Sequence, residues 1–362
     1  MKNKYISVGL IVLLLITSFI VINKNGAQEP LVFTEEQKIR NITAFAKIYG
    51  YVRYFHPSDE AADLDWDTFG VYGVEQVKNA KTKKELHETL EDLFSPIAPT
   101  VRIANKEVGY SFKDIFEENN TSNYLFWQHL GVETNMTIIP STGNVNPYAS
   151  SNRVVIKSNL ELENQLSEQV PPKEKWVIHK EVSNNLHLYL PLVIPINEEE
   201  KTIGTTSETF TAFEELEQEL KNVKQNGIHA TDENARISGI ITTWNIFQHF
   251  YPYWDEVEVN WEAQLAPYLT EALHDQTYED YLTTLRMLVE NVQDAGAVVT
   301  GKDDSRMFSL PIRVREVDEK IIVTEALDSQ FQSWRYGSFH RWHSRNGVND
   351  ASKTGNFRPR TS

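Results

Sequence analysis

The chain contains no cysteine among its 362 residues. Disulfide bonds, thiolate metal sites and a cysteine nucleophile are therefore excluded, although a cysteine-free chain fits either redox compartment. Positive charge is also scarce, because 35 lysines and arginines stand against 51 aspartates and glutamates, for a formal net charge of −16. Recognition of a phosphate backbone needs clustered basic residues, so we expect no nucleic-acid partner. The acidic excess is expected to serve solubility.

Several catalytic signatures are missing as well. The sequence has no G-x-S-x-G, S-x-x-K, H-E-x-x-H or Walker A motif. Its histidines do not show metal-ligand spacing, except for His340 and His343 in an atypical tail, where a chance pair is the simpler explanation. A serine nucleophile needs a positioned base and an oxyanion hole. No serine has a base at a recognisable spacing, so we expect no metal site and no complete catalytic set.

The longest apolar run lies close to the amino terminus. Lys2 and Lys4 precede 17 uncharged residues, Ile6–Ile22. A signal peptide has this order of charge, but its apolar region is usually shorter and ends at small residues. The run has the minimum length of a spanning helix. We predict an uncleaved membrane anchor through residues 6–22, with a cleaved signal peptide as the alternative. In both cases the rest of the chain is exported, either anchored to the cell membrane or secreted or periplasmic.

Residues 42–93 recur without a gap as residues 237–288. A shift of 195 positions pairs Phe55 with Phe250 and Trp66 with Trp261, and many other pairs keep their class. Two copies separated by about a hundred other residues indicate a duplicated module and not a solenoid.

Each copy is predicted to form three helices. In the first copy the expected caps are Thr34, Asp65 and Thr82, and the first helix is expected to end near His56, because the residue before a proline resists the α conformation. In the second copy the expected starts are Asp232, Asn260 and Thr277.

Between the copies the pattern changes to that of strands. Arg153–Ile156, Trp176–His179 and Leu186–Val193 favour strands, and the last of these alternates apolar and polar residues. Glu208–Lys224 is predicted to be a charged helix. After the second copy, Leu310–Val317 and Lys320–Val323 flank Asp318-Glu319 and predict a β-hairpin.

Aromatic residues are concentrated where the first helix of each copy ends. We call Tyr54–Pro57 the first aromatic turn and Phe250–Trp254 the second aromatic turn. One interpretation is a shelf for a peptide or sugar, with His56, Tyr251, Tyr253 and Trp254 as ligand-binding candidates. The other is a helix-ending turn whose rings pack against Trp66 or Trp261. Burying an aromatic ring stabilises a fold by roughly 1.5–3 kcal/mol, which favours the packing interpretation.

Segments in several parts of the chain resemble one family. Leu288–Val299 resembles the segment that precedes the PDZ-like domain in tricorn-like and C-terminal-processing serine peptidases. Other segments resemble, in family order, the β-domain, the second helical repeat and the first PDZ-like strands of secreted bacterial members. They are Trp127–Val132, Tyr148–Val154, Asn245–Asp255, Val259–Glu262 and Leu310–Val314. The resemblance covers roughly residues 35–330. It implies hydrolysis of peptide bonds in a protein or peptide substrate, without a metal or organic cofactor.

The sequence departs from the family in two places. The position of the family's catalytic histidine is Gly296, so the motif residue Asp294 has no histidine to assist. Family members also continue through a complete PDZ-like domain into a core that carries the nucleophilic serine. Here the last 29 residues, from Trp334, hold five arginines, whereas the 333 residues before them hold nine. We interpret this change as a disordered basic tail or a frameshift near Trp334, and expect a truncated chain that is inactive alone.

The predicted fold is α+β and multidomain, with two three-helix repeats flanking a β-rich, sandwich-like domain and followed by the first strands of a PDZ-like domain. The predicted boundaries are 1–30 for the signal anchor or signal peptide, 31–100 for repeat one, 101–200 for the β-rich domain, 201–231 for the charged helix and linker, 232–300 for repeat two, 301–333 for the PDZ-like start and 334–362 for the basic tail.

Two other functions remain compatible with the sequence. The chain is a candidate binding module that holds a peptide or glycan at the cell surface through the aromatic turns. It is also a candidate inactive partner that docks on an intact paralogue through the free edge of its hairpin.

Overall fold

The computed structural model combines helices with small antiparallel sheets, in agreement with the predicted α+β class. It describes residues 33–111, 113, 123–129, 151–157, 175–294, 296–301, 312–317 and 320–326. The chain divides into two compact units, Met1–Val299 and Thr300–Ser362. The predicted anchor and the basic tail lie outside the described residues. Within those residues, no helix is both long and apolar enough to cross a membrane.

The first repeat contains the three predicted helices and one further short helix. The Thr34 hydroxyl accepts a hydrogen bond from the Gln37 backbone N–H at 3.2 Å, and the Thr82 hydroxyl accepts one from Glu85 at 3.1 Å. Each cap satisfies an amide that the first helical turn leaves without a partner, so these predicted starts are confirmed. The additional helix, α3, follows Ser58. The elements are α2 (Glu35–Phe55), α3 (Asp59–Asp63), α4 (Trp66–Val77) and α5 (Lys83–Phe94).

The second repeat has the same order of helices, but its middle helix begins differently. Thr277 and Asp280 form a reciprocal capping box, as predicted. The Asn260 side chain accepts a hydrogen bond from the Ala263 N–H at 3.2 Å, but a 3₁₀ turn follows it and the α-helix begins only at Leu265. The elements are α8 (Glu233–Phe250), η3 (Glu262–Gln264), α9 (Leu265–His274) and α10 (Tyr278–Glu290).

The charged segment between the repeats forms α7 (Ser207–Gln225), as predicted. Asn226 caps its carboxyl end, and Gly227 follows with a φ of +82°. Glycine adopts this left-handed conformation without the steric cost of a side chain, which explains why the helix ends there.

Six strands form two three-stranded antiparallel sheets. The sheet β1-β5-β4 contains Arg102–Ala104, Leu186–Pro191 and Val177–Ser183, and the sheet β3-β2-β6 contains Ser151–Lys157, Asn123–His129 and Val193–Pro195. The strand predictions in this region are confirmed, whereas a sandwich of the two sheets stays a prediction.

The central strand β5 is more buried than its sequence predicts. Its alternation of leucines predicts one buried face, yet all six residues are buried. α2 contacts this strand, and Leu188 lies in the main core. On the other face, the Tyr189 ring stacks on His179 with centroids 4.5 Å apart and meets Tyr110 edge-on at 5.7 Å. Neighbouring side chains from distant segments therefore cover what an isolated strand would expose.

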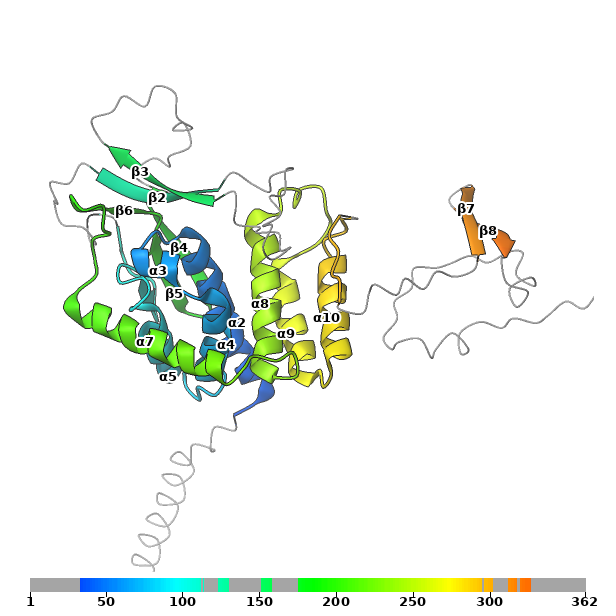
Figure 1. The fold of residues 1–362 in the computed structure, drawn as a ribbon, viewed down its shortest axis with the longest axis horizontal. Helices are drawn as coiled ribbons and strands as arrows, with labels where there is room; N and C mark the ends of the chain where they lie inside the picture. The colour runs from blue at the N-terminus through cyan, green and yellow to red at the C-terminus, as the bar shows by residue number, and fades with distance from the viewer. Residues whose placement is uncertain are drawn as a thin grey trace, which may run out of the picture. The chain divides into compact units, whose positions relative to one another are not determined.

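One hydrophobic core joins both helical repeats to the sheet β1-β5-β4. Its fully buried members include Phe45 and Phe69 from the first repeat and Ile241 and Leu269 from the second. In Figure 1, α2, α4, α8 and α9 form the helical body of the first unit. α2 contacts α9, and α4 contacts α8. The first helix of each copy thus packs against the second helix of the other, which is the pattern of a two-fold pair.

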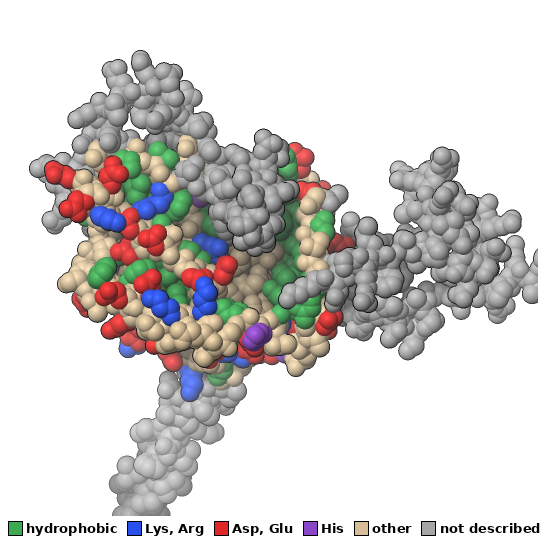
Figure 2. All heavy atoms as spheres, in the orientation of Figure 1, with side chains coloured by type: hydrophobic (Ala, Val, Ile, Leu, Met, Phe, Trp, Pro, Cys, Tyr) green, Lys and Arg blue, Asp and Glu red, His purple; other side chains and the backbone are tan. Residues whose placement is uncertain are grey.

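Ion pairs join the two repeats at the surface. The Lys47 ammonium lies 2.6 Å from the Glu262 carboxylate, and Lys78 lies 3.2 Å from Glu233. Figure 2 shows acidic and basic side chains interspersed on one face of the molecule, with small apolar areas between them. In both pairs the carboxylate remains partly exposed to solvent. Such pairs contribute little to stability, so burial in the shared core holds the repeats together.

The second unit contains the predicted hairpin. β7 (Ile312–Val317) pairs antiparallel with β8 (Lys320–Ala326), and the register shifts between Arg313 and Val314. The hairpin is therefore confirmed, with a second strand longer than predicted. The residues of its turn, Asp318-Glu319, lie outside the described part.

Candidate functional site

The two copies repeat a buried hydrogen bond as well as a sequence pattern. The Tyr49 hydroxyl donates to the Trp66 carbonyl oxygen at 3.1 Å. At the equivalent positions of the second copy, the Trp244 indole N–H donates to the Trp261 carbonyl oxygen at 3.0 Å. Both donors are polar groups on rings that are otherwise buried, and such groups need a partner. The shift of 195 positions therefore relates two structurally equivalent modules.

The aromatic turns of the two copies meet at the ends of α2 and α8. The Tyr54 and Phe250 rings pack edge-on with centroids 5.0 Å apart, and the Phe55 and His249 rings do so at 5.0 Å. Tyr54 is equivalent to His249, and Phe55 to Phe250, so each turn makes the same crossed contact to the other. The two turns thus lie on either side of a pseudo-two-fold axis and form one aromatic cluster.

His56, one of the ligand-binding candidates, is fully buried. Its Nδ1 lies 2.9 Å from the Ser58 hydroxyl and its Nε2 lies 2.9 Å from the Thr100 hydroxyl. Burial, with a smaller contribution from the Arg153 charge, lowers the pKa of His56 to about 3. The imidazole is therefore neutral near pH 7, and both of its nitrogens have partners within the chain. In this structure it is a packed residue with no exposed surface for a ligand.

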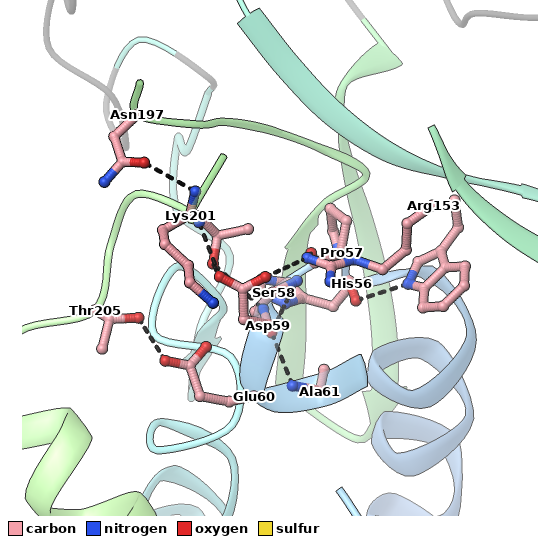
Figure 3. A network of polar contacts seen from close by, with 12 residues as sticks. His56, Pro57, Ser58, Asp59, Glu60, Ala61, Arg153, Asn197, Lys201 and Thr205 are labelled. Carbon is pink, nitrogen blue, oxygen red and sulfur yellow. Dashed lines mark hydrogen bonds and ion pairs between the residues drawn. The ribbon is translucent and has the colours of Figure 1, made fainter. Parts of the chain in front are cut away.

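Strands β2 and β3 cover the first aromatic turn. The Trp127 indole N–H donates to the His56 carbonyl oxygen at 3.1 Å. The Arg153 guanidinium donates to the Pro57 carbonyl oxygen and to the Asp59 carboxylate, both at 2.7 Å. Figure 3 shows Arg153 reaching across to Pro57 and Asp59. We call Trp127 and Arg153 together the clamp, because they hold this turn against the β-rich part of the chain.

Asp59 is held from a second side by the segment after β6. Its other carboxylate oxygen accepts hydrogen bonds from the Thr202 backbone N–H at 3.0 Å and from the Thr202 hydroxyl at 3.1 Å. Burial alone would raise the pKa of Asp59, but the hydrogen bonds from Thr202 and Arg153 outweigh it and lower the pKa. A carboxylate with these donors stays ionised at neutral pH.

Replacing Arg153 by glutamine is expected to reduce the free energy of unfolding by about 1–2 kcal/mol, because Asp59 and the Pro57 carbonyl lose their donor. Urea denaturation at neutral pH would measure this. Arg40→Gln is the matched control, since Arg40 forms an exposed pair with Glu36 on one helix, and we expect a change of about 0.5 kcal/mol or less. Equal effects of the two substitutions would contradict the role given to the clamp.

The second aromatic turn is more open. The Trp254 ring stacks on Trp261 with centroids 5.0 Å apart and 30° between the planes, and its indole N–H donates to the Phe247 carbonyl oxygen at 3.0 Å. Tyr251 and Trp254 are half-buried, whereas Tyr253 is 51% exposed. Tyr251 meets Trp254 edge-on at 4.8 Å. The candidates Tyr251, Tyr253 and Trp254 therefore form a rigid aromatic surface that is only partly covered.

Asp294 and Gly296 lie beside this turn. Partial burial and the nearby Asp294 carboxylate raise the pKa of the Tyr251 hydroxyl, with smaller contributions from Tyr253 and Glu256. Asp294 also accepts a hydrogen bond from the Gly296 backbone N–H at 2.8 Å. A Cβ atom on Gly296 would meet only the Asp294 carboxylate, at 3.2 Å. A side chain at this position would therefore require only a small shift of the Asp294 carboxylate.

No complete catalytic set is assembled within the described part of the chain. Among the described residues there is no group of three or more histidine, aspartate or glutamate side chains placed to hold a metal. Asp294 has no histidine beside it, and the His340–His343 pair lies outside the described residues. The described residues at this site present aromatic faces and carboxylates.

Sequence reasoning missed the clamp and the histidines of the aromatic cluster. Trp127 and Arg153 belong to strand segments, and nothing in their local pattern indicates that they contact a turn 71 and 96 residues away. His249 was visible only as the partner of Tyr54 in the repeat. The repeat itself could have predicted the contacts of His249, because equivalent residues next to a two-fold axis contact each other.

Comparisons with models of known protein families, with curated proteins and with solved structures found no match for this chain.

Proposed function

We propose that the chain is the amino-terminal, non-catalytic region of an exported serine peptidase of the tricorn-like type, anchored through residues 6–22 or secreted. On this proposal it does not hydrolyse peptide bonds alone and contributes a helical and β-rich scaffold. The observation that carries the proposal is the Leu288–Val299 segment. It resembles the family's segment and lies at the end of the second repeat, but it carries Gly296 at the position of the histidine.

The position of this segment supports the proposal. It follows α10. In the turn that leads towards Val299, the Asp294 carboxylate accepts a hydrogen bond from the Gly296 N–H at 2.8 Å, and the Asp294 carbonyl oxygen accepts one from the Ala297 N–H at 3.0 Å. A hairpin follows in the second unit, where the family has its first PDZ-like strands. Peptide-bond hydrolysis needs a nucleophile, a base and an oxyanion hole together. Among the described serines, Ser58 lies 2.9 Å from the Nδ1 of His56, but both residues are buried and the Ser58 hydroxyl donates to the Ile97 carbonyl oxygen at 2.7 Å.

The purified full chain is expected to show no peptidase activity towards fluorescent casein and no labelling by a fluorophosphonate probe, because it lacks an activated serine. A serine peptidase of known activity is the positive control. The variant Gly296→His is expected to fold and to stay inactive, since a base without a nucleophile cannot cleave. Labelling of the chain that is lost on mutating one serine would contradict the proposal.

The second candidate is a binding module for a peptide or glycan. One observation favours it, namely that Tyr253 keeps half of its surface exposed while Trp254 beside it is fixed on Trp261. Rigid, partly exposed aromatic residues lose little conformational entropy on binding. This function is independent of peptidase ancestry, and a binding experiment separates the two.

A further inference from the structure

We infer that the second aromatic turn is a docking surface for an extended, arginine-bearing protein segment. The inference rests on the duplication, because the first copy contains an equivalent turn with its covering partner already in place, although Asp59 of the first copy corresponds to Trp254 in the second. The inference rests on the binding-module function and specifies the class of its ligand. It does not depend on the proposal that the chain belongs to a peptidase.

The first copy shows which groups suit this turn. Its backbone carbonyl oxygens at His56 and Pro57 accept from the indole of Trp127 and the guanidinium of Arg153. Both donors belong to a pair of antiparallel strands, with Trp127 and Arg153 in register opposite each other. A carboxylate at Asp59 completes the contact to the guanidinium at 2.7 Å. The covering partner is thus an extended segment with an arginine.

In the second copy, the equivalent carbonyl groups have no hydrogen-bond donor among the described residues. His56 and Pro57 correspond to Tyr251 and Pro252, and no described residue donates a hydrogen bond to either of those two carbonyl oxygens. Pro252 and Tyr253 are exposed. The rest of the turn is fixed by internal contacts, since the Glu256 N–H donates to the Tyr253 carbonyl at 3.0 Å and Trp254 stacks on Trp261. The surface is preformed, which lowers the cost of binding.

The charge of the second turn fits a cationic ligand. Asp255 and Glu256 are exposed, and Asp294 lies next to the Tyr251 ring. An arginine side chain binds carboxylates through its planar fork and also stacks on tyrosine and tryptophan faces. A surface that offers both is selective for arginine over a neutral residue. A neutral ligand, such as a neutral glycan, would gain only hydrogen bonds and no charge pairing from these carboxylates, and an acidic ligand would be repelled by them.

The test is fluorescence anisotropy with the full chain and a labelled decapeptide of alternating valine and arginine. The control peptide carries citrulline, which has nearly the shape of arginine without its charge. We expect the arginine peptide to bind at least about tenfold more tightly than the citrulline peptide. Tyr253→Ala and the double variant Asp255→Asn/Glu256→Gln are each expected to weaken binding of the arginine peptide about five- to tenfold.

Two matched variants separate this site from general attraction to an acidic protein. Phe210 has the same exposure as Tyr253, 51%, and lies on α7, so Phe210→Ala controls for loss of an exposed ring. Glu198→Gln/Glu199→Gln removes two exposed carboxylates elsewhere. Neither is expected to change the affinity. The inference is overturned if the control variants weaken binding as much, if both peptides bind equally, or if chitotetraose binds and the arginine peptide does not.

Discussion

Lowering the pH from about 7.5 to about 5 is expected to reduce the free energy of unfolding by about 4 kcal/mol, through two buried histidines. Burial, aided by the Arg153 charge, lowers the pKa of His56 to about 3. Burial, with contributions from His129 and Lys180, lowers the pKa of His249 to about 4. His249 lies among the rings of Tyr51, Tyr54, Phe55 and Phe250.

The direction of this change in stability follows from the pH at which each imidazole takes up its proton. In the unfolded chain a histidine protonates below about pH 6.5, whereas in the folded protein His249 and His56 protonate only near pH 4 and pH 3. Between these values the unfolded state binds more protons, so stability falls as the pH falls. At about pH 5 each histidine contributes a loss of about 2 kcal/mol. The loss continues to lower pH until the folded pKa is reached.

Urea denaturation followed by far-ultraviolet circular dichroism at a series of pH values measures this effect. His249→Leu is expected to remove one of the two largest contributions to the pH dependence between about pH 7.5 and 5, while His56 and, to a smaller extent, His129, whose pKa burial also lowers, still titrate. The Nε2 atom of His249 has no hydrogen-bond partner, so leucine costs no hydrogen bond there. His274→Gln, at an exposed histidine, is the control and should keep the full dependence. A flat pH profile for the unaltered chain would refute the assignment.

Replacing Gly50 by alanine is expected to reduce the free energy of unfolding by about 2 kcal/mol, although alanine favours a helix by about 1 kcal/mol. Gly50 lies where α2 meets α8, and a Cβ atom there would lie 1.8 Å from the Asn245 side-chain oxygen. Asn245 is fully buried. Its amide donates to the Ala46 and Ile241 carbonyl oxygens, each at 2.9 Å, and so it cannot move without losing these bonds.

A double-mutant cycle tests whether overlap with the Asn245 side chain causes this loss of stability. Asn245→Ala alone is expected to cost about 1–2 kcal/mol, since the Ala46 carbonyl loses its donor. In the double variant Gly50→Ala/Asn245→Ala the overlap with Asn245 is gone and only the contact to His249 Nε2 at 2.9 Å remains. The loss should therefore be smaller than the sum of the single losses by at least about 1 kcal/mol. Gly109→Ala is the control, because a Cβ atom at Gly109 meets nothing within 4 Å. Additive losses would show that the overlap is not the cause.

The helices were predictable because their signals are local. A cap such as Thr82 or Thr277 accepts a hydrogen bond from a residue three positions later, so the pattern is legible in four residues. The duplication is also detectable in the sequence, since finding it requires only a comparison of the sequence with itself. Where the local signal was weaker, the prediction was less accurate. Asn260 precedes a 3₁₀ turn, and α3 was not predicted at all.

The local sequence of the two aromatic turns did not predict their different surroundings. The two turns have similar compositions, and the sequence left packing and ligand binding open for both. In the structure the first turn is covered by Trp127 and Arg153, whereas Tyr253 in the second keeps half of its surface exposed. The difference arises from strands that lie 71 to 96 residues along the chain from the first turn.

The helical repeats, their caps, the strand segments and the hairpin follow from the amino-acid sequence, because hydrogen bonds and apolar spacing within a few residues specify them. The pairing of Gly50 with Asn245, the burial of both faces of β5 and the clamp on the first aromatic turn follow from the tertiary structure alone. These contacts join segments up to about two hundred residues apart. Their energies depend on shape and burial that no local pattern encodes.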